Sequence, residues 1–252
     1  MSDSRDTPEP GGPARRPGIV RSIAGLAADL AYIARSRMAP MRYGMLPPPP
    51  HEPSSGTARP PVLLIPGVFE SWHYLRAIGE RLAARGHPVH RVPELGLNRH
   101  PIDRAARLLG DYVRDRDLRD LVLVSHSKGG LIGKAMLIAE ADADAHDAVE
   151  AHGHRRISRL ITVNTPFRGT PVARWGLGPW REFRPEAAII RTLDARTDVN
   201  DRITSLVSAV DQYVPRAIAR LDGAENVVLD RVGHFRVLGL PDVIDEIERR
   251  LP

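Results

Sequence analysis

The chain has 252 residues, of which 42% are hydrophobic and 27% are charged. A chain of this length can bury a substantial core, and this balance is typical of a soluble globular protein. Cysteine is absent, which excludes disulfide bonds and thiolate metal sites. The net charge is +5, and all but two of the 36 basic residues are arginines interleaved with acidic residues. Because no basic block occurs, we expect no nucleic-acid partner.

Residues 1–60 are predicted to form an arm that precedes the main domain. Met1–Gly18 is polar and rich in proline and glycine, which predicts a disordered tail. Ile19–Met38 has apolar residues near helical spacing, which predicts one amphipathic helix. Its four charged residues exclude a bilayer span and a signal-peptide core. Leu46–Pro61, with four consecutive prolines, predicts a stiff linker.

We expect the helix of this arm to dock on the domain that follows it. The alternative is a helix that lies on a membrane surface and gives the protein peripheral membrane contact. Since no export signal is evident, the expected location is cytoplasmic, with membrane association as the alternative.

From residue 61 to residue 252, strand and helix patterns alternate as in a single domain. This alternation predicts an α/β fold with a mostly parallel, doubly wound sheet. The expected strands are Val62–Ile65, Val89–Val92, Leu121–Ser125, Ile157–Val163, Ile203–Val210 and Val227–Asp230. The expected helices are Trp72–Arg85, Ile102–Arg116, Lys128–Ala139 and Pro241–Leu251.

The segment Val122–Ile132 joins a β-branched run to a helix through a tight turn that holds Ser127. This pattern is typical of a nucleophile elbow, in which a strained turn exposes the serine hydroxyl. The helix that follows directs backbone N–H groups at the reacting centre, and the pair Gly129-Gly130 lets it approach the strand. Ser125 stands where the motif usually has glycine. The competing interpretation is an ordinary strand-to-helix connection.

Two later loops supply the partners that a serine nucleophile needs. A serine hydroxyl reacts poorly near neutral pH unless a base takes its proton and an acid orients that base. Asp211 follows the strand Ile203–Val210, and His234 follows the strand Val227–Asp230, so both leave the sheet at its carboxyl edge. We therefore expect Ser127, Asp211 and His234 to be catalytic. Competing acids without this strand-end position are Asp222, Glu225 and Asp230.

The oxyanion that forms in such a reaction needs two hydrogen-bond donors. One would be the backbone N–H of Lys128, directly after the nucleophile, and the other would come from the loop Ile65–Glu70. Gly67 permits an unusual turn there. We assign the second donor to Val68, with Phe69 as the alternative, and a plain turn closing the strand is the competing interpretation.

These segments together resemble the α/β-hydrolase superfamily, in particular its bacterial lipase-like and esterase-like members. The resemblance covers residues 61–252 and departs from the family pattern at Pro66, where members often have histidine, and at Ser125. It implies the α/β-hydrolase fold and a serine nucleophile. The matching segments are Leu64–Val68, Ser125–Gly130, Asn164–Thr170 and the loops of Asp211 and His234.

The resemblance also implies a small cap at about residues 171–202, after a stretch, Thr165–Thr170, that is similar to one in lipase-like relatives. We expect Trp175, Trp180 and Phe69 to contact an acyl chain. The alternative is that the cap aromatics only pack the cap onto the domain. The large apolar cap residues are Trp175, Leu177, Trp180 and Phe183.

Three other features compete for a role. The Lys128 side chain follows the nucleophile and is expected to turn to solvent. The segment Asp142–His154 is rich in acids and histidines, but because no element fixes its geometry we expect a solvated loop and no metal site. Asn98–His100 follow a strand end and are candidates for substrate contact at the pocket rim.

The sequence thus predicts a serine hydrolase that cleaves a small-molecule or lipid carboxylic ester without a cofactor. The reaction would pass through an acyl-enzyme on Ser127, with His234 as general base and Asp211 as orienting acid. Two alternatives stay open. One is a thioesterase or acyltransferase with the same triad, and the other is a non-catalytic hydrolase-like binding module.

Overall fold

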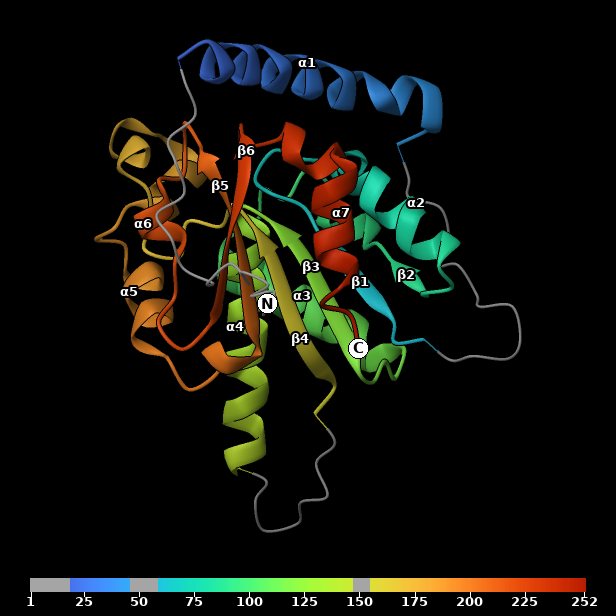
Figure 1. Cartoon of the computed structure of the whole chain (residues 1–252). Helices are drawn as coiled ribbons and strands as arrows, with labels where there is room; N and C mark the ends of the chain where they lie inside the picture. The colour runs from blue at the N-terminus through green and yellow to red at the C-terminus, as the bar shows by residue number, and fades with distance from the viewer. Residues whose placement is uncertain (1–18, 46–58, 147–154) are drawn as a thin grey trace, which may run out of the picture.

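A computed structural model of the chain describes residues 19–45, 59–146 and 155–252. The disorder expected for Met1–Gly18 and most of the linker expected at Leu46–Pro61 fall outside these residues. Figure 1 shows one twisted sheet at the centre of the molecule, with helices packed against both of its sides.

The sheet has six parallel strands in the order β2-β1-β3-β4-β5-β6. Parallel strands need crossover connections, and helices supply them on both faces, as the alternating pattern predicts. The fold is therefore the α/β, doubly wound class expected from the sequence. The strands are β1 (Val62–Ile65), β2 (Val89–His90), β3 (Leu121–His126), β4 (Ile157–Val163), β5 (Ile203–Val210) and β6 (Glu225–Val232).

Alternate residues of the central strands feed two separate cores, one on each face of the sheet. In β1, Leu63 and Ile65 pack into the core that contains α3 and α4, whereas Val62 and Leu64 pack into the core that contains α2 and α7. All four side chains are buried, which explains why this strand is a continuous apolar run. The helices are α1 (Ile19–Tyr43), α2 (Arg76–Ala84), α3 (Ile102–Asp115), α4 (Lys128–His146), α5 (Ala188–Ala195), α6 (Arg216–Ala219) and α7 (Pro241–Glu248).

The observed bounds differ from the predicted ones mainly where proline or a tight turn intervenes. The helix expected from residue 72 begins with a 3-10 turn, Trp72–Leu75, and only then continues as α2. Strand β2 ends early because Pro93 opens another 3-10 turn. Helix α4 runs past the expected end at Ala139 to His146, so the start of the predicted acidic loop is helical.

Helix α1 lies across the carboxyl edge of the sheet, where Figure 1 shows it above the ends of β5 and β6. It packs against β6 and the 3-10 turns before α2 and α7. The approach is close, since a Cβ at Gly25 would lie 2.5 Å from the Val232 side chain. Tyr32 donates a hydrogen bond to the Tyr74 carbonyl at 2.7 Å. Among the described residues, no helix is both long and apolar enough to cross a membrane.

Candidate active site

A pocket at the carboxyl edge of the sheet brings together residues from distant parts of the chain. Its floor includes Ser127 and His234, its sides include the loop after β1 and the cap, and its roof includes α1 through Ile33 and Arg37. Six non-glycine residues of the described chain have positive φ, and four of them lie at this edge of the sheet. Such strained backbone concentrates at functional sites. These four are Phe69, Asn98, Ser127 and Asn164.

Ser127 occupies a sharp turn between β3 and α4, with φ of 50°. The two glycines that follow are needed because the helix starts against two neighbouring segments. A Cβ at Gly129 would lie 2.2 Å from the Ile65 carbonyl oxygen, and one at Gly130 would lie 2.1 Å from Thr165 Oγ1. The Thr165 hydroxyl in turn donates to the Ser127 carbonyl at 2.9 Å. The turn is therefore held from both sides with its serine facing the pocket.

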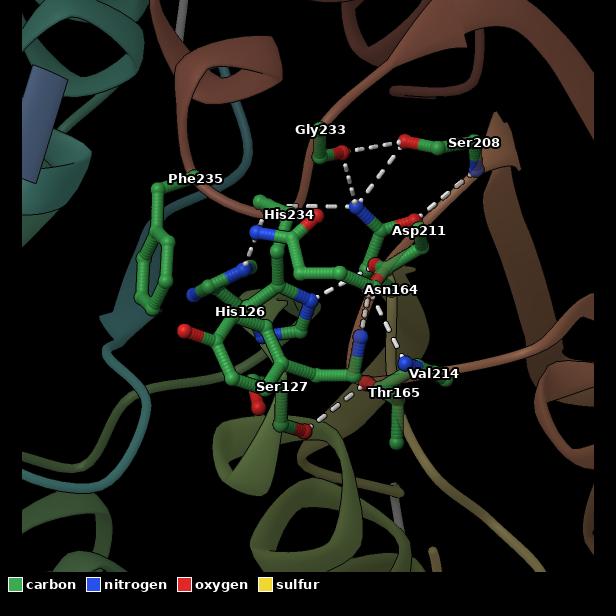
Figure 2. Close-up of polar contacts among 12 residues, drawn as sticks. His126, Ser127, Asn164, Thr165, Ser208, Asp211, Val214, Gly233, His234 and Phe235 are labelled. Carbon is green, nitrogen blue, oxygen red and sulfur yellow. Dashed lines mark hydrogen bonds and ion pairs between the residues drawn. The ribbon is translucent and has the colours of Figure 1, made fainter. Parts of the chain in front are cut away.

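Asp211 and His234 meet although 23 positions separate them in the chain. The Asp211 carboxylate accepts from His234 Nδ1 at 2.6 Å and from the backbone N–H groups of Tyr213 and Val214 at 2.7 and 2.9 Å. The Asp211 side chain is 0% exposed. Since Nδ1 donates, the neutral ring keeps Nε2 as a free proton acceptor. Figure 2 shows the His234 ring between Asp211 on one side and Ser127 on the other.

The environment of His234 favours its protonated form. Burial alone lowers the pKa of His234, but the Asp211 carboxylate, together with Glu70 and Asp29, outweighs burial, so the pKa is raised. The competing acids are placed otherwise. Asp222 has a side chain that is 92% exposed, and Glu225 pairs with Arg250.

Backbone N–H groups near Ser127 are available for a developing oxyanion. Lys128 is the first residue of α4, and the first N–H groups of a helix have no partner within it. In the loop after β1, the Gly67 N–H is occupied, because it donates to the Glu70 carboxylate at 2.8 Å. Val68 and Phe69 follow it, and both line the pocket.

A buried pair, Glu70 and His126, lies beneath this arrangement and was not singled out from the sequence. His126 Nδ1 is 2.8 Å from Glu70 Oε1, and His126 Nε2 donates to the His234 carbonyl at 3.0 Å. A carbonyl only accepts, so Nε2 is the donor in this contact. The His126 ring therefore bridges the Glu70 carboxylate and the His234 carbonyl. It also links the loop after β1 to the loop of His234.

Asn164 fixes the His234 loop from the other side. Its amide nitrogen donates to the carbonyls of Gly233 and His234 at 3.3 and 3.1 Å, and its oxygen accepts from the Ser208 N–H at 2.8 Å. The His234 carbonyl thus accepts from both Asn164 and His126, as Figure 2 shows. Asn164 lies directly after β4 and has a positive φ, which asparagine adopts more readily than most residues. An asparagine at a strand end is therefore the sequence signal that could have marked it.

A third position that sequence reasoning missed is Asp29 of α1. It is 1% exposed, and its carboxylate accepts from the backbone N–H groups of Phe235 and Arg236, both at 2.7 Å. It also accepts from the Gln212 side chain at 2.6 Å. One acidic residue therefore ties α1 to both loops that carry Asp211 and His234.

The Lys128 side chain is fully buried, which corrects the expectation that it turns to solvent. Its ammonium donates to the carbonyls of Asn98, at 3.2 Å, and His100, and lies 3.9 Å from Glu182 of the cap. Burial lowers the pKa of Lys128 to about 8, although Glu182 opposes this. Asn98 is also buried and donates to the Pro66 carbonyl at 2.7 Å, so its side chain supports the loop after β1 rather than the pocket rim.

The structure brings only part of the predicted cap contacts to the pocket. Trp180 lines it together with Phe183, and their rings meet edge to face at 5.8 Å. Trp175 is 88% exposed and lies outside the pocket lining, because it ends a short 3-10 turn on the outer side of the cap. Phe69 is part of the lining.

The acidic and histidine-rich segment gives no metal site in the described part of the chain. Asp142 and Asp144 lie on α4, and Asp142 pairs with Arg196 at 2.8 Å. The rest of the segment, from residue 147 to residue 154, falls outside the described residues. No group of three potential ligands occurs among those that are described.

Comparisons with known proteins give structural matches only: no protein-family model matches the chain, and no curated protein matches its sequence. Among solved structures it is similar to the mature lipase BlEst2 of Bacillus licheniformis, with a TM-score of 0.59 and 17% identity over 81% of this chain and 99% of that one. It is also similar to carboxylesterase CesB of Bacillus subtilis, with a TM-score of 0.54 and 12% identity over 90% and 98%. With this topology and these matches, the chain has the α/β-hydrolase fold.

Proposed function

We propose that this protein is a serine hydrolase that cleaves carboxylic esters. The observation that carries the proposal is the buried hydrogen bond between Asp211 and His234, in the same pocket as a serine with strained backbone. An acid that orients a histidine in the same pocket as a serine is the arrangement that activates a hydroxyl for acyl transfer.

In this mechanism the Ser127 oxygen attacks the ester carbonyl while His234 Nε2 accepts the hydroxyl proton. The carbonyl oxygen becomes an oxyanion that accepts from the N–H of Lys128 and from that of Val68 or Phe69. The tetrahedral intermediate then expels the alcohol, which takes the proton from His234, and leaves an acyl group on Ser127. A water molecule attacks the acyl-enzyme by the same proton route and releases the carboxylic acid.

Carboxylic esters are favoured over other acyl compounds by two observations. The pocket wall is apolar, with Phe69, Trp180 and Phe183 facing the space above Ser127. The solved structures that share this fold include proteins named as a lipase and a carboxylesterase. An acyl chain would lie against these side chains, with its carbonyl at the floor of the pocket.

A fluorophosphonate probe tests the proposal, because it phosphonylates only an activated serine and releases fluoride. We expect the wild type to be labelled and Ser127→Ala to lose all labelling. Ser125→Ala is the matched control, since Ser125 is buried and its hydroxyl faces the Ile161 carbonyl at 3.4 Å. Equal labelling of wild type and Ser127→Ala, or none of either, would contradict the proposal.

A second assay can then determine which type of acyl bond is cleaved and which molecule accepts the acyl group. We expect faster turnover of p-nitrophenyl esters than of matched acyl-thioesters, with free acid as the product. Preference for the thioester, or transfer of the acyl group to an added alcohol in place of water, would assign the same triad to a thioesterase or an acyltransferase.

A further inference from the structure

The outward face of α1 is apolar over nearly its whole described length. From Ile23 to Met41, exposed residues recur on this face at helical spacing, and they form an apolar stripe. The large members of the stripe are Ile23, Leu30, Met38 and Met41, whose exposed fractions are 63%, 66%, 63% and 88%. The smaller members of the stripe are Ala27, Ala31 and Ala34.

The inward face of the same helix carries polar and small residues. Asp29 and Ser36 are buried against the domain, as are Gly25 and the hydroxyl-bearing Tyr32. A surface helix of a soluble domain normally turns its apolar stripe to the core and its polar face to water. Helix α1 is docked the other way round, so its apolar stripe has no partner within the described chain.

The charges of α1 favour an anionic partner. Arg35, Arg37 and Arg42 are exposed and flank the apolar stripe, whereas the only acidic residue from Ser22 to Tyr43 is the buried Asp29. A recess of about 680 Å³ beside the stripe is lined by Arg35, Arg42 and Arg76. One of these three, Arg76, pairs with Glu80 at 2.6 Å.

Exposed apolar side chains are not scattered over the molecule. In the described part of the chain, every large exposed one lies on α1 or the two residues after it, on the cap, or in the loop after β2. Single exposed apolar residues are normal, but a contiguous patch marks an interaction site. Those outside the stripe are Tyr43 at the end of α1, Met45, Leu97, Val172, Trp175 and Leu177.

We propose that the outward face of α1 docks on an anionic lipid surface. An apolar stripe flanked by arginines is the pattern of a helix that lies in the plane of such an interface. Each arginine near a negatively charged leaflet adds to the attraction, and the stripe enters the acyl boundary. A protein partner of the same extent would need acidic groups beside its apolar face, whereas an anionic membrane offers both everywhere.

This docking brings the catalytic pocket to the membrane, because α1 also lines that pocket, through Ile33 and the flanking Arg37. Under the proposed ester hydrolysis, the substrate is then an ester of a membrane lipid, taken from the leaflet on which α1 rests. The inference deepens the proposed function, but the surface itself can be tested without it.

Sedimentation with vesicles measures the docking independently of catalysis. We expect binding to vesicles that contain about one third phosphatidylglycerol in phosphatidylcholine, weak binding to phosphatidylcholine alone, and loss of binding in high salt. The variant Leu30→Glu/Met38→Glu should weaken binding by about a hundredfold, because it places two carboxylates in the stripe. The charge-matched control is Ala84→Glu/Ala143→Glu, on exposed residues of α2 and α4, and should bind as the wild type does.

Hydrolysis of a soluble p-nitrophenyl ester separates this inference from the proposed function. Leu30 and Met38 do not line the catalytic pocket, so the stripe variant should keep its activity on this substrate and lose it on esters held in vesicles. Vesicle binding without ester hydrolysis would overturn the catalytic proposal alone. Activity on the soluble ester with no vesicle binding would overturn the docking. So would a wild-type dimer, observed in the absence of vesicles, that the substitutions of the stripe variant dissociate into monomers.

Discussion

The floor and sides of the pocket, which we together call its wall, and the roof of the pocket are held in different ways. The wall, made by the loops after the strands, is fixed by a network of buried hydrogen bonds in which the His234 loop alone contacts Asp211, His126 and Asn164. The roof, α1, packs on β6 and on neighbouring turns, and Asp29 hydrogen-bonds it to the loops of Asp211 and His234. Several hydrogen bonds from different loops hold the wall, which suits side chains that must keep their relative positions within a fraction of an ångström.

A single buried carboxylate is a different kind of attachment. Its three donors belong to the loops of Asp211 and His234, so the position of the roof follows the position of these two loops. From this comparison we infer two separate roles: the wall determines the reaction, and the roof determines how substrate reaches the pocket. Variants of each can separate the two roles.

The largest effect is expected from the wall, in Asp211→Asn. An amide at this position no longer fixes the His234 tautomer with Nδ1 protonated, so kcat should fall by about 10⁴-fold while the fold is kept. Steady-state kinetics on a soluble ester measures this. Asp222→Asn is the control, since that acid competes in the sequence but is exposed, and it should leave kcat unchanged.

Glu70→Gln should give the next largest loss. The pair formed by Glu70 and His126 joins the loop after β1 to the His234 loop, and a small displacement of either loop should lower kcat by up to about 100-fold. KM for a short ester should change little, because Glu70 acts through other groups. That split between kcat and KM distinguishes a positioning residue from one that only supports the fold.

Two further variants complete this test. Glu80→Gln removes an exposed carboxylate that pairs with Arg76 within α2, and it should have no effect on kcat. His126→Gln should resemble Glu70→Gln in the size of its effect, because either change breaks the same link. A loss confined to one of the two would argue against a shared role.

The sequence was sufficient for the fold because its strand signals are local. β1 and β3 are apolar on both faces, and only a sheet covered on both sides buries such strands. The bounds of β4 and β5 agree with the prediction, since apolar runs between turn residues define them. The strand-end positions of Asp211 and His234 follow from the same signals, because parallel strands end at one edge.

The polar supports of the site were beyond this reasoning. Glu70 and His126 are 56 positions apart, and neither carries a spacing that points to the other. Asp29 interrupts the apolar pattern of its helix and looks like a solvated charge until its three donors are known. Lys128 was misjudged for a related reason: its long side chain reaches carbonyls of a separate loop and so is buried with its charge.

The roof is tested by Asp29→Ala, with a smaller effect on catalysis. The change leaves the N–H groups of Phe235 and Arg236 without their acceptor, which should lower the free energy of unfolding by about 1–3 kcal/mol. Helix α1 should also be cut faster by trypsin at its exposed arginines. Denaturant unfolding and limited proteolysis measure the two effects. Asp111→Ala, on the exposed face of α3, is the control and should change neither.

The smallest effect is a shift in pH dependence that couples roof to wall. His234 is the base only when neutral, and its raised pKa places the acid limb of kcat/KM above its ordinary value of about 6.5. Asp29→Asn keeps an acceptor for the backbone N–H groups but removes a negative charge that stabilises the imidazolium. The limb should therefore move to lower pH, by less than in Asp211→Asn, because the Asp211 carboxylate contacts the ring directly. A limb that stays in place, or moves to higher pH, would mean that the charge of α1 is not felt at His234, and that roof and wall are coupled by contact alone.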